Sequence, residues 1–425
     1  PKGAAIPSSL TNVDTMLAQA LAAQTARNLD GASALYQSVL DISPDHADAL
    51  HMLGVIRMEQ GDAVTATRLI LNALDKVGWR IDFFRHNLGL AMSKLASRKQ
   101  DWRSRHARVA EYRARPPVAA QSHTLSVKPL VSVVIPSYNH AAYLHAALDS
   151  VFAQTYDNFE VVVVDDGSHD ASPEILREYA RTHHQRMRLI VRENRGAPAT
   201  LNELVALSRG DWIQPLNSDD QLSPNRLETM VAHVAARGDQ FGFGAVRCID
   251  DDGNPIDELA HAQAFEFRCA QSAIAFGETV GFCFLGGNPA ISTGNFFFSK
   301  SLFNRVGGFA DLRYHHDWDF CLRAVRWSEP IYVDSPSYRY RLHGSNTIHE
   351  QGGAQRQEVD TMMAAHLEYS LTALCENPWA PTYPVWGAVF LEEVFGAGVG
   401  ALVLPNQIRQ IANELMTEYS NQRHP

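Results

Sequence analysis

The sequence has few cysteines and no paired cysteine motif, which excludes several small-domain classes. Its five cysteines include no Cys-x-x-Cys pair: Cys248, Cys269, Cys283, Cys321 and Cys375. Neither a zinc knuckle nor a thioredoxin-like motif is indicated. An odd number of cysteines in a long chain also argues against a disulfide framework, so we expect a reducing cytoplasm.

Long apolar runs and an excess of positive charge are also missing. No run reaches the roughly 18 residues needed to span a bilayer, and the nearest stretch, 388–405, is interrupted by Glu392 and Glu393. We therefore expect at most peripheral contact with a membrane. The 37 Lys and Arg residues are outnumbered by 47 Asp and Glu residues, which disfavours nucleic-acid binding through a broad basic surface.

What remains is a globular composition in a long chain. The 425 residues are 45% hydrophobic and 20% charged, which is typical of a folded protein with two or three domains.

The first hundred residues show self-similarity at a period of 34. Ala32 and Ala66 are separated by this distance, as are Leu40 and Leu74. The period is similar to that of the tetratricopeptide repeat and predicts an all-helical domain over 10–97; the alternative is a set of helical hairpins with accidental spacing. Such repeats bind a protein partner or acceptor, or drive self-association. A basic helix and linker are expected at 98–129.

A different pattern begins at residue 130. Short β-branched runs at 131–136, 160–164, 188–192 and 212–216 alternate with helical segments. This alternation predicts an α/β domain over 130–350 with a mainly parallel sheet. Residues 351–425 are expected to form a helical extension.

Polar clusters follow each of the four predicted strands. Because ligands bind outside the carboxyl ends of strands in open α/β sheets, the clusters predict one shared cleft. They comprise Pro136, Tyr138 and Asn139; Asp165, Asp166, Gly167 and Ser168; Asn194 and Gly196; and Asn217, Ser218, Asp219 and Asp220.

Six motifs follow one another along the α/β region. In order they are VSVVIPSYN, VVVVDDGSHDAS, ENRGAPATLNELVALSRGDWI, LNSDD, VGGF-ADLRYHHDWDFCLR and YRLHGSN. This set resembles the family 2 glycosyltransferases, whose GT-A fold carries a Rossmann-like mixed sheet. The resemblance implies an inverting transfer from a nucleotide-diphosphate sugar, expected to be a UDP-sugar, to a hydroxyl. The acceptor would be a glycan, a lipid-linked molecule or a protein.

The resemblance also implies roles for the donor-side residues. Tyr138 matches the position that stacks on the nucleobase, and Asp165 and Asp166 match an acidic pair that accepts hydrogen bonds from base and ribose. Asn194, Gly196 and Asn202 belong to a segment that closes over the nucleotide. A plain turn with helix capping is the alternative for the 165–168 segment.

The LNSDD segment implies a divalent cation. Family members usually have Asp-x-Asp here, which holds Mn²⁺ or Mg²⁺ against the diphosphate. In this chain Asn217 replaces the first aspartate, so Asp219 is the expected metal ligand, and His343 matches a late histidine that completes the site. A structural role is the alternative for His343.

On the acceptor side, Asp317 matches the catalytic base, with His316 where the family usually has glutamate. Asn295, His316 and Trp318 are expected near the acceptor. The competing interpretation makes Asp317 or Asp319 a helix N-cap. The competing function is a non-catalytic, nucleotide-binding adaptor whose repeats mediate protein–protein interaction. Asn217 and His316 are the features that favour it.

Overall fold

The computed structural model describes residues 8–79, 81–97, 109–112, 114, 128–235, 240–344, 346, 353–403 and 405–421. They form two compact units. The helical unit combines residues 1–107 with 367–372 and 382–425, and the α/β unit combines 108–366 with 373–381. Most of the basic segment and linker predicted at 98–129 lies outside the described residues.

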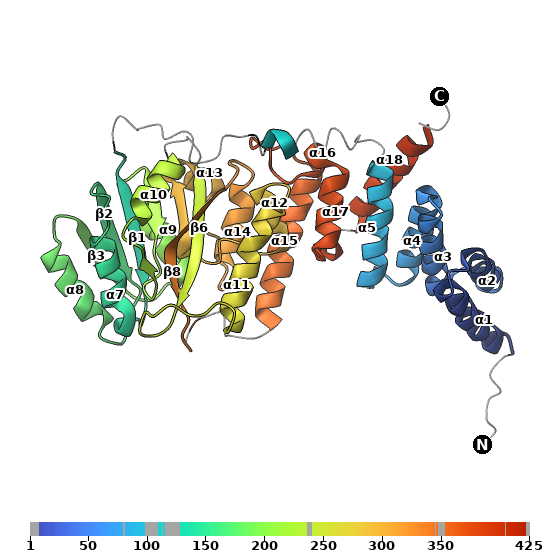
Figure 1. The fold of residues 1–425 in the computed structure, drawn as a ribbon, viewed down its shortest axis with the longest axis horizontal. Helices are drawn as coiled ribbons and strands as arrows, with labels where there is room; N and C mark the ends of the chain where they lie inside the picture. The colour runs from blue at the N-terminus through green and yellow to red at the C-terminus, as the bar shows by residue number, and fades with distance from the viewer. Residues whose placement is uncertain are drawn as a thin grey trace, which may run out of the picture. The chain divides into compact units, whose positions relative to one another are not determined.

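The N-terminal part of the helical unit is all α, as predicted. Its helices are α1 (Ser8–Thr25), α2 (Leu29–Ile42), α3 (Ala47–Glu59), α4 (Ala63–Lys76) and α5 (Asp82–Ser97) (Figure 1). Helices α2 and α4 begin 34 residues apart, and each has an N-cap side chain, Asn28 or Asp62, that accepts a backbone N–H from the third residue on. The sequence period is therefore a period of helix starts as well.

The C-terminal helices of the helical unit are α16 (Tyr383–Trp386), α17 (Ala388–Gly396) and α18 (Pro405–Asn421). Helix α17 packs against α5, where the Phe395 ring lies over Gly89 so closely that a Cβ there would be 2.1 Å from Cγ of the ring. Arg409 on α18 pairs with Asp75 on α4 at 2.5 Å. The C-terminal residues thus complete the same core as the N-terminal helices.

The α/β unit is built on one mixed sheet of eight strands in the order β3-β2-β1-β4-β7-β6-β8-β5. Strands β1, β2, β3 and β4 are parallel to one another, β6 and β8 are parallel, and β7 and β5 run antiparallel to their neighbours. The strands are β1 (Val131–Ser137), β2 (Phe159–Asp165), β3 (Met187–Val191), β4 (Trp212–Pro215), β5 (Gln221–Leu222), β6 (Phe241–Ile249), β7 (Phe296–Ser299) and β8 (Ile331–Arg341). The predicted mixed, largely parallel sheet is confirmed.

Helices cover both faces of this sheet. Alternate residues of β1, such as Val131 and Val133, share a core with α7 (Ala141–Phe152), α8 (Ser172–Thr182) and α10 (Arg226–His233). Val134, which points the other way, is also buried, and α9 (Ala197–Leu207) packs on β1 and β2. This two-sided burial explains the continuous apolar runs of β1 and β2.

The remaining segments lie after β6. They are α11 (Ala262–Ser272), η3 (Ala273–Ala275), α12 (Val280–Gly286), η4 (Thr293–Asn295), α13 (Lys300–Val306), α14 (His316–Ala324) and α15 (Gly353–Thr372), with η6 (Val399–Leu402) between α17 and α18. None of the helices in the described part of the chain is long and apolar enough to cross a membrane.

Candidate active site

The predicted polar clusters meet at the carboxyl edge of the sheet, where hydrogen bonds join one loop to the next. The Asn139 N–H donates to Ser168 Oγ at 2.9 Å, and the His169 N–H donates to Asn139 Oδ1 at 2.8 Å. The Gly196 N–H donates to Asp166 Oδ2 at 2.9 Å. Parallel strands place their carboxyl ends together, which is why loops distant in sequence become neighbours here.

The acidic pair after β2 holds these loops in place. Asp165 accepts both the N–H and the hydroxyl of Ser168, at 3.0 and 2.7 Å. Asp166 accepts the N–H of Arg195 at 2.8 Å and the guanidinium of Arg192, besides Gly196. Both carboxylates are buried, so they organise the loops after β2 and β3 directly.

Gly167 and Tyr138 lie beside these carboxylates. The backbone conformation requires glycine at 167, and the side chain at 138 is exposed. Gly167 has φ +80°, and a Cβ there would lie 2.8 Å from the Asn194 nitrogen, so only glycine fits. Tyr138 is 42% exposed, so its side chain is accessible to a ligand. Tyr138 follows the end of β1, where Pro136 is in register with Val164 of β2.

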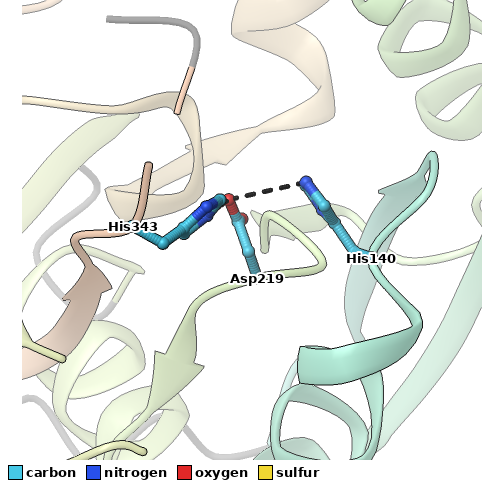
Figure 2. Close-up of side chains that lie close together, drawn as sticks. All are labelled: His140, Asp219 and His343. Carbon is cyan, nitrogen blue, oxygen red and sulfur yellow. Dashed lines mark hydrogen bonds and ion pairs between the residues drawn. The ribbon is translucent and has the colours of Figure 1, made fainter. Parts of the chain in front are cut away.

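A potential cation site lies between three loops. His140 follows β1, Asp219 follows β4 and His343 follows β8 (Figure 2), and their ligand atoms lie within 4.8 Å of one another. Asp219 Oδ2 is 3.1 Å from His343 Nε2 and 3.8 Å from His140 Nε2. Oδ1 of Asp219 is buried and has no hydrogen-bond partner among the described residues.

The electrostatics of this site favour an anionic Asp219. Burial alone would raise the pKa of its carboxyl group, but the hydrogen bond with His343 and the charges of His140 and His343 together lower it below the usual value. An ionised carboxylate with an unused oxygen suits a divalent cation. The predicted ligands Asp219 and His343 are therefore placed together, and the donor set fits a metal.

The neighbouring residues of the LNSDD segment face the protein interior. Asn217 Nδ2 donates to Asp220 Oδ2 at 3.1 Å and to Ser292 Oγ at 2.8 Å. Asp220 also accepts the hydroxyl of Tyr338 and the backbone N–H of Arg341. Burial, followed by the charge of Asp219, raises the pKa of Asp220 well above its usual value. Asp220 thus ties the loop to β8.

The segment 288–295 links the cation site to the predicted base. Ser292 contacts Asn217 as above, and Thr293 Oγ1 lies 3.3 Å from His316 Nε2. Asn288 Nδ2 donates to Asp317 Oδ2 at 2.9 Å. The residues predicted for donor and acceptor are therefore connected through one short segment.

Asp317 is the second residue of α14. Burial raises the pKa of its carboxyl group from 3.8 to about 7, although hydrogen bonds from the Trp318 N–H and Asn288 oppose the rise. The N-cap of α14 is His315, so the interpretation of Asp317 or Asp319 as the cap is wrong. Asp319 instead accepts from Arg323 Nε at 2.9 Å.

Other predicted residues have structural contacts. Asn295 is fully buried, and its amide donates to the carbonyls of Gly244 and Ala290 while accepting from Arg226. Its hydrogen-bonding capacity is used within the protein, so we do not propose an acceptor contact for it. Asn202 forms two hydrogen bonds with the backbone of Phe309.

His316 and Trp318 flank Asp317 on α14. Burial lowers the pKa of His316 to about 4, so its imidazole is neutral at physiological pH. The indole N–H of Trp318 donates to the Phe284 carbonyl at 2.8 Å. Both side chains are held in place beside the carboxylate, and both remain partly accessible.

A family model describes most of this sheet. Residues 132–307 match the model of glycosyl transferase family 2. Residues 132–307 thus form a glycosyltransferase family 2 domain. This is the family expected from the motifs, and the mixed sheet is that of its GT-A fold.

Curated relatives agree with this assignment. A Bacillus subtilis (strain 168) relative named as a glycosyltransferase, EpsH, is 30% identical over 52% of this chain and 63% of its own length. The chondroitin synthase of Escherichia coli is 30% identical over 53% of this chain and 31% of its own. The chain thus covers less than two thirds of either relative. S. aureus TarS, solved with UDP-GlcNAc, aligns with a TM-score of 0.46 and 17% identity over 69% of this chain and 91% of that one.

Two residues near the site of this family 2 domain were given no role from the sequence. His140 directly follows the predicted cluster at Asn139, and its place just after a strand end is the signal that could have identified it. Asn288 lies in a glycine-rich stretch, Gly286-Gly287-Asn288, whose sequence position gives no indication of contact with Asp317. Only the fold brings them together.

Proposed function

We propose that the protein is an inverting glycosyltransferase that moves a sugar from a nucleotide-diphosphate sugar to an acceptor hydroxyl. The main support for this proposal is a pair of carboxylates in a family 2 domain whose pKa values are shifted in opposite directions. Asp219 is held anionic beside two histidines, whereas Asp317 has a pKa of about 7. One carboxylate is suited to a cation and the other to accepting a proton near neutral pH.

On the donor side, Tyr138 would stack on the nucleobase, because aromatic faces bind bases of any sequence. Asp165 and Asp166 would act mainly through the loops that they fix, since both carboxylates are already hydrogen-bonded within the protein. Asp219 and His343 would hold a divalent cation, Mn²⁺ or Mg²⁺. Such a cation neutralises the charge that develops on a departing diphosphate.

On the acceptor side, Asp317 would accept the proton of the attacking hydroxyl. Asn288 and the Trp318 N–H hold its two oxygens in a fixed orientation. Because the sugar–oxygen bond to the acceptor forms on the face opposite the departing diphosphate, the anomeric configuration would invert. A glycan is the first acceptor class to test, since one relative is named chondroitin synthase.

We propose further that the helical unit binds protein, either a protein acceptor or a second copy of this chain. The repeated helix starts at 34-residue spacing support a tetratricopeptide-like array, and such arrays offer a surface to a peptide or a subunit. Light scattering of the purified chain over a range of concentrations would separate self-association from recruitment of another protein.

The proposed activity is tested by measuring nucleoside-diphosphate release. Full-length protein is incubated with UDP-sugars and GDP-sugars, each with and without Mn²⁺, and with glycan acceptors. We expect release from one donor class, stimulated by Mn²⁺ and by an acceptor. Tight nucleotide binding without release under any of these conditions would favour the non-catalytic adaptor instead.

A further inference from the structure

The cation site contains a histidine that the LNSDD segment does not supply. His140 comes from the loop between β1 and α7, and its Nε2 faces Asp219 Oδ2 at 3.8 Å (Figure 2). Two nitrogen donors and one carboxylate, on three loops, surround one small volume. These donor atoms lie close enough together for movement of the side chains to bring them onto one cation.

His140 is held in the orientation that a ligand requires. Its Nδ1 lies 2.8 Å from the hydroxyl of Ser218, the residue before Asp219. Histidine ligands usually use one ring nitrogen for the metal and fix the ring through the other. The contact with Ser218 leaves Nε2 directed toward Asp219.

Asn217 does not supply the carboxylate that the first aspartate of Asp-x-Asp would have. Its amide nitrogen is committed to Asp220 and Ser292, and the residue carries no charge. Oδ1 of Asp219, however, is buried and has no hydrogen-bond partner in the described part of the chain. A buried carboxylate oxygen without a donor indicates a ligand that these contacts do not include.

We propose that His140 is the third protein ligand of this site, in place of the missing aspartate, and that it makes the site selective for Mn²⁺ or a similar transition metal over Mg²⁺. The inference rests on the proposed cation at Asp219 and His343. Mg²⁺ prefers oxygen ligands in octahedral geometry, whereas imidazole nitrogens suit first-row transition metals. Exchanging a carboxylate for an imidazole therefore changes which metal the site prefers.

Metal binding is measured directly on full-length protein, with Mn²⁺ alone and Mg²⁺ alone as probes. Calorimetry gives both affinities, and electron paramagnetic resonance of bound Mn²⁺ reports nitrogen ligands through hyperfine coupling. We expect tighter binding of Mn²⁺ than of Mg²⁺ and coupling to two imidazole nitrogens. Equal affinities, or coupling to one nitrogen only, would overturn the proposal without any variant.

The variant series separates this inference from the proposed function. His140→Ala should weaken Mn²⁺ binding by at least about tenfold and leave Mg²⁺ binding nearly unchanged, and Ser218→Ala should weaken Mn²⁺ binding about tenfold. His145→Ala is the matched control, because His145 is exposed on α7 and contacts Tyr179. Thermal unfolding shows whether each variant is folded, and His140→Asn is the second choice if His140→Ala is not.

Asp219→Asn completes the series. If it abolishes Mn²⁺ binding while folded His140→Ala binds Mn²⁺ like the wild type, the third-ligand proposal is refuted and the cation site stands. If folded Asp219→Asn also binds Mn²⁺ normally, the cation site itself is wrong and this inference fails with it.

Discussion

Replacing Asp317 by asparagine separates the catalytic role of this residue from its structural one. Asparagine keeps the shape and one acceptor oxygen for the Trp318 N–H or for Asn288, but it cannot take a proton. If Asp317 is the base, turnover should fall by roughly 10²–10⁴-fold, the usual contribution of a positioned general base. Nucleotide affinity should hardly change, since the base contacts the acceptor.

The same substitution has a predictable effect on stability. Burial raises the pKa of Asp317 from 3.8 to about 7. Between these values the folded chain retains a proton that the unfolded chain releases, so the stability of the wild type falls as the pH rises from about 4 to about 7. At about 1.4 kcal/mol per tenfold change in proton affinity, the total is about 4 kcal/mol. The asparagine variant lacks this loss and should become the more stable protein by up to that amount near pH 8.

Two measurements check this reasoning. Urea unfolding at pH 4.5 and pH 8 gives the difference in stability between wild type and variant. Diphosphate release in the presence of an acceptor gives turnover. Wild-type kcat/KM should also decrease below about pH 7, because the base becomes protonated. Asp319→Asn is the matched control, because Asp319 pairs with Arg323. It should lose about 1 kcal/mol of stability and keep its turnover. A folded Asp317→Asn enzyme with near wild-type turnover would refute the assignment of the base.

Three further predictions concern the cation site and the helical unit. Asp219→Asn should abolish the Mn²⁺-dependent gain in UDP affinity measured by calorimetry, and an unchanged gain would contradict its role. Asn217→Asp adds a charge beside buried Asp220 and removes a donor to it. Without metal it should therefore lower the free energy of unfolding by about 1–3 kcal/mol, and Mn²⁺ should restore part of this loss. An unchanged melting temperature in metal-free buffer would argue against these contacts. Gly89→Ala inserts a methyl group against Phe395, and its overpacking cost of about 1–3 kcal/mol should exceed the roughly 1 kcal/mol gain in helix propensity. Gly396→Ala, with nothing within 4 Å, should be neutral or stabilising in urea unfolding, and equal losses in both variants would contradict the packing of α17 on α5.

The strands could be predicted from the sequence because a strand that is buried on both faces is a continuous run of apolar residues. The runs at 131–136 and 160–164 became β1 and β2 with one residue added at one or both ends. The loops that follow were also placed correctly at one edge, since that follows from parallel strands alone. What a strand pattern does not record is the direction of each loop side chain, which depends on contacts between segments far apart in the chain.

Asn295 and Asn202 illustrate that limit. Both are polar residues near motifs, and both were expected to contact ligands. In the fold, Asn295 satisfies buried backbone groups around Gly244 and Asn202 clamps the backbone at Phe309. A buried asparagine that is fully hydrogen-bonded and an asparagine that binds a ligand have the same sequence signal, because the partner decides the role.

Asp219 and Asp220 show that the charge of a carboxyl group also depends on partners that the sequence does not reveal. The two residues are adjacent and chemically identical, and both lie at a strand end where the motif expects acidic groups. Asp219 meets two histidines and has a lowered pKa, whereas Asp220 meets a tyrosine, an amide and its charged neighbour and has a raised one. Two buried carboxylates this close cannot both ionise cheaply, so fixing the charge on one favours a proton on the other. The oxygens of Asp220 are already used by donors of the protein, from Asn217, Tyr338 and Arg341, which leaves Asp219, with its unpartnered Oδ1, as the carboxylate of the pair that can bind a cation.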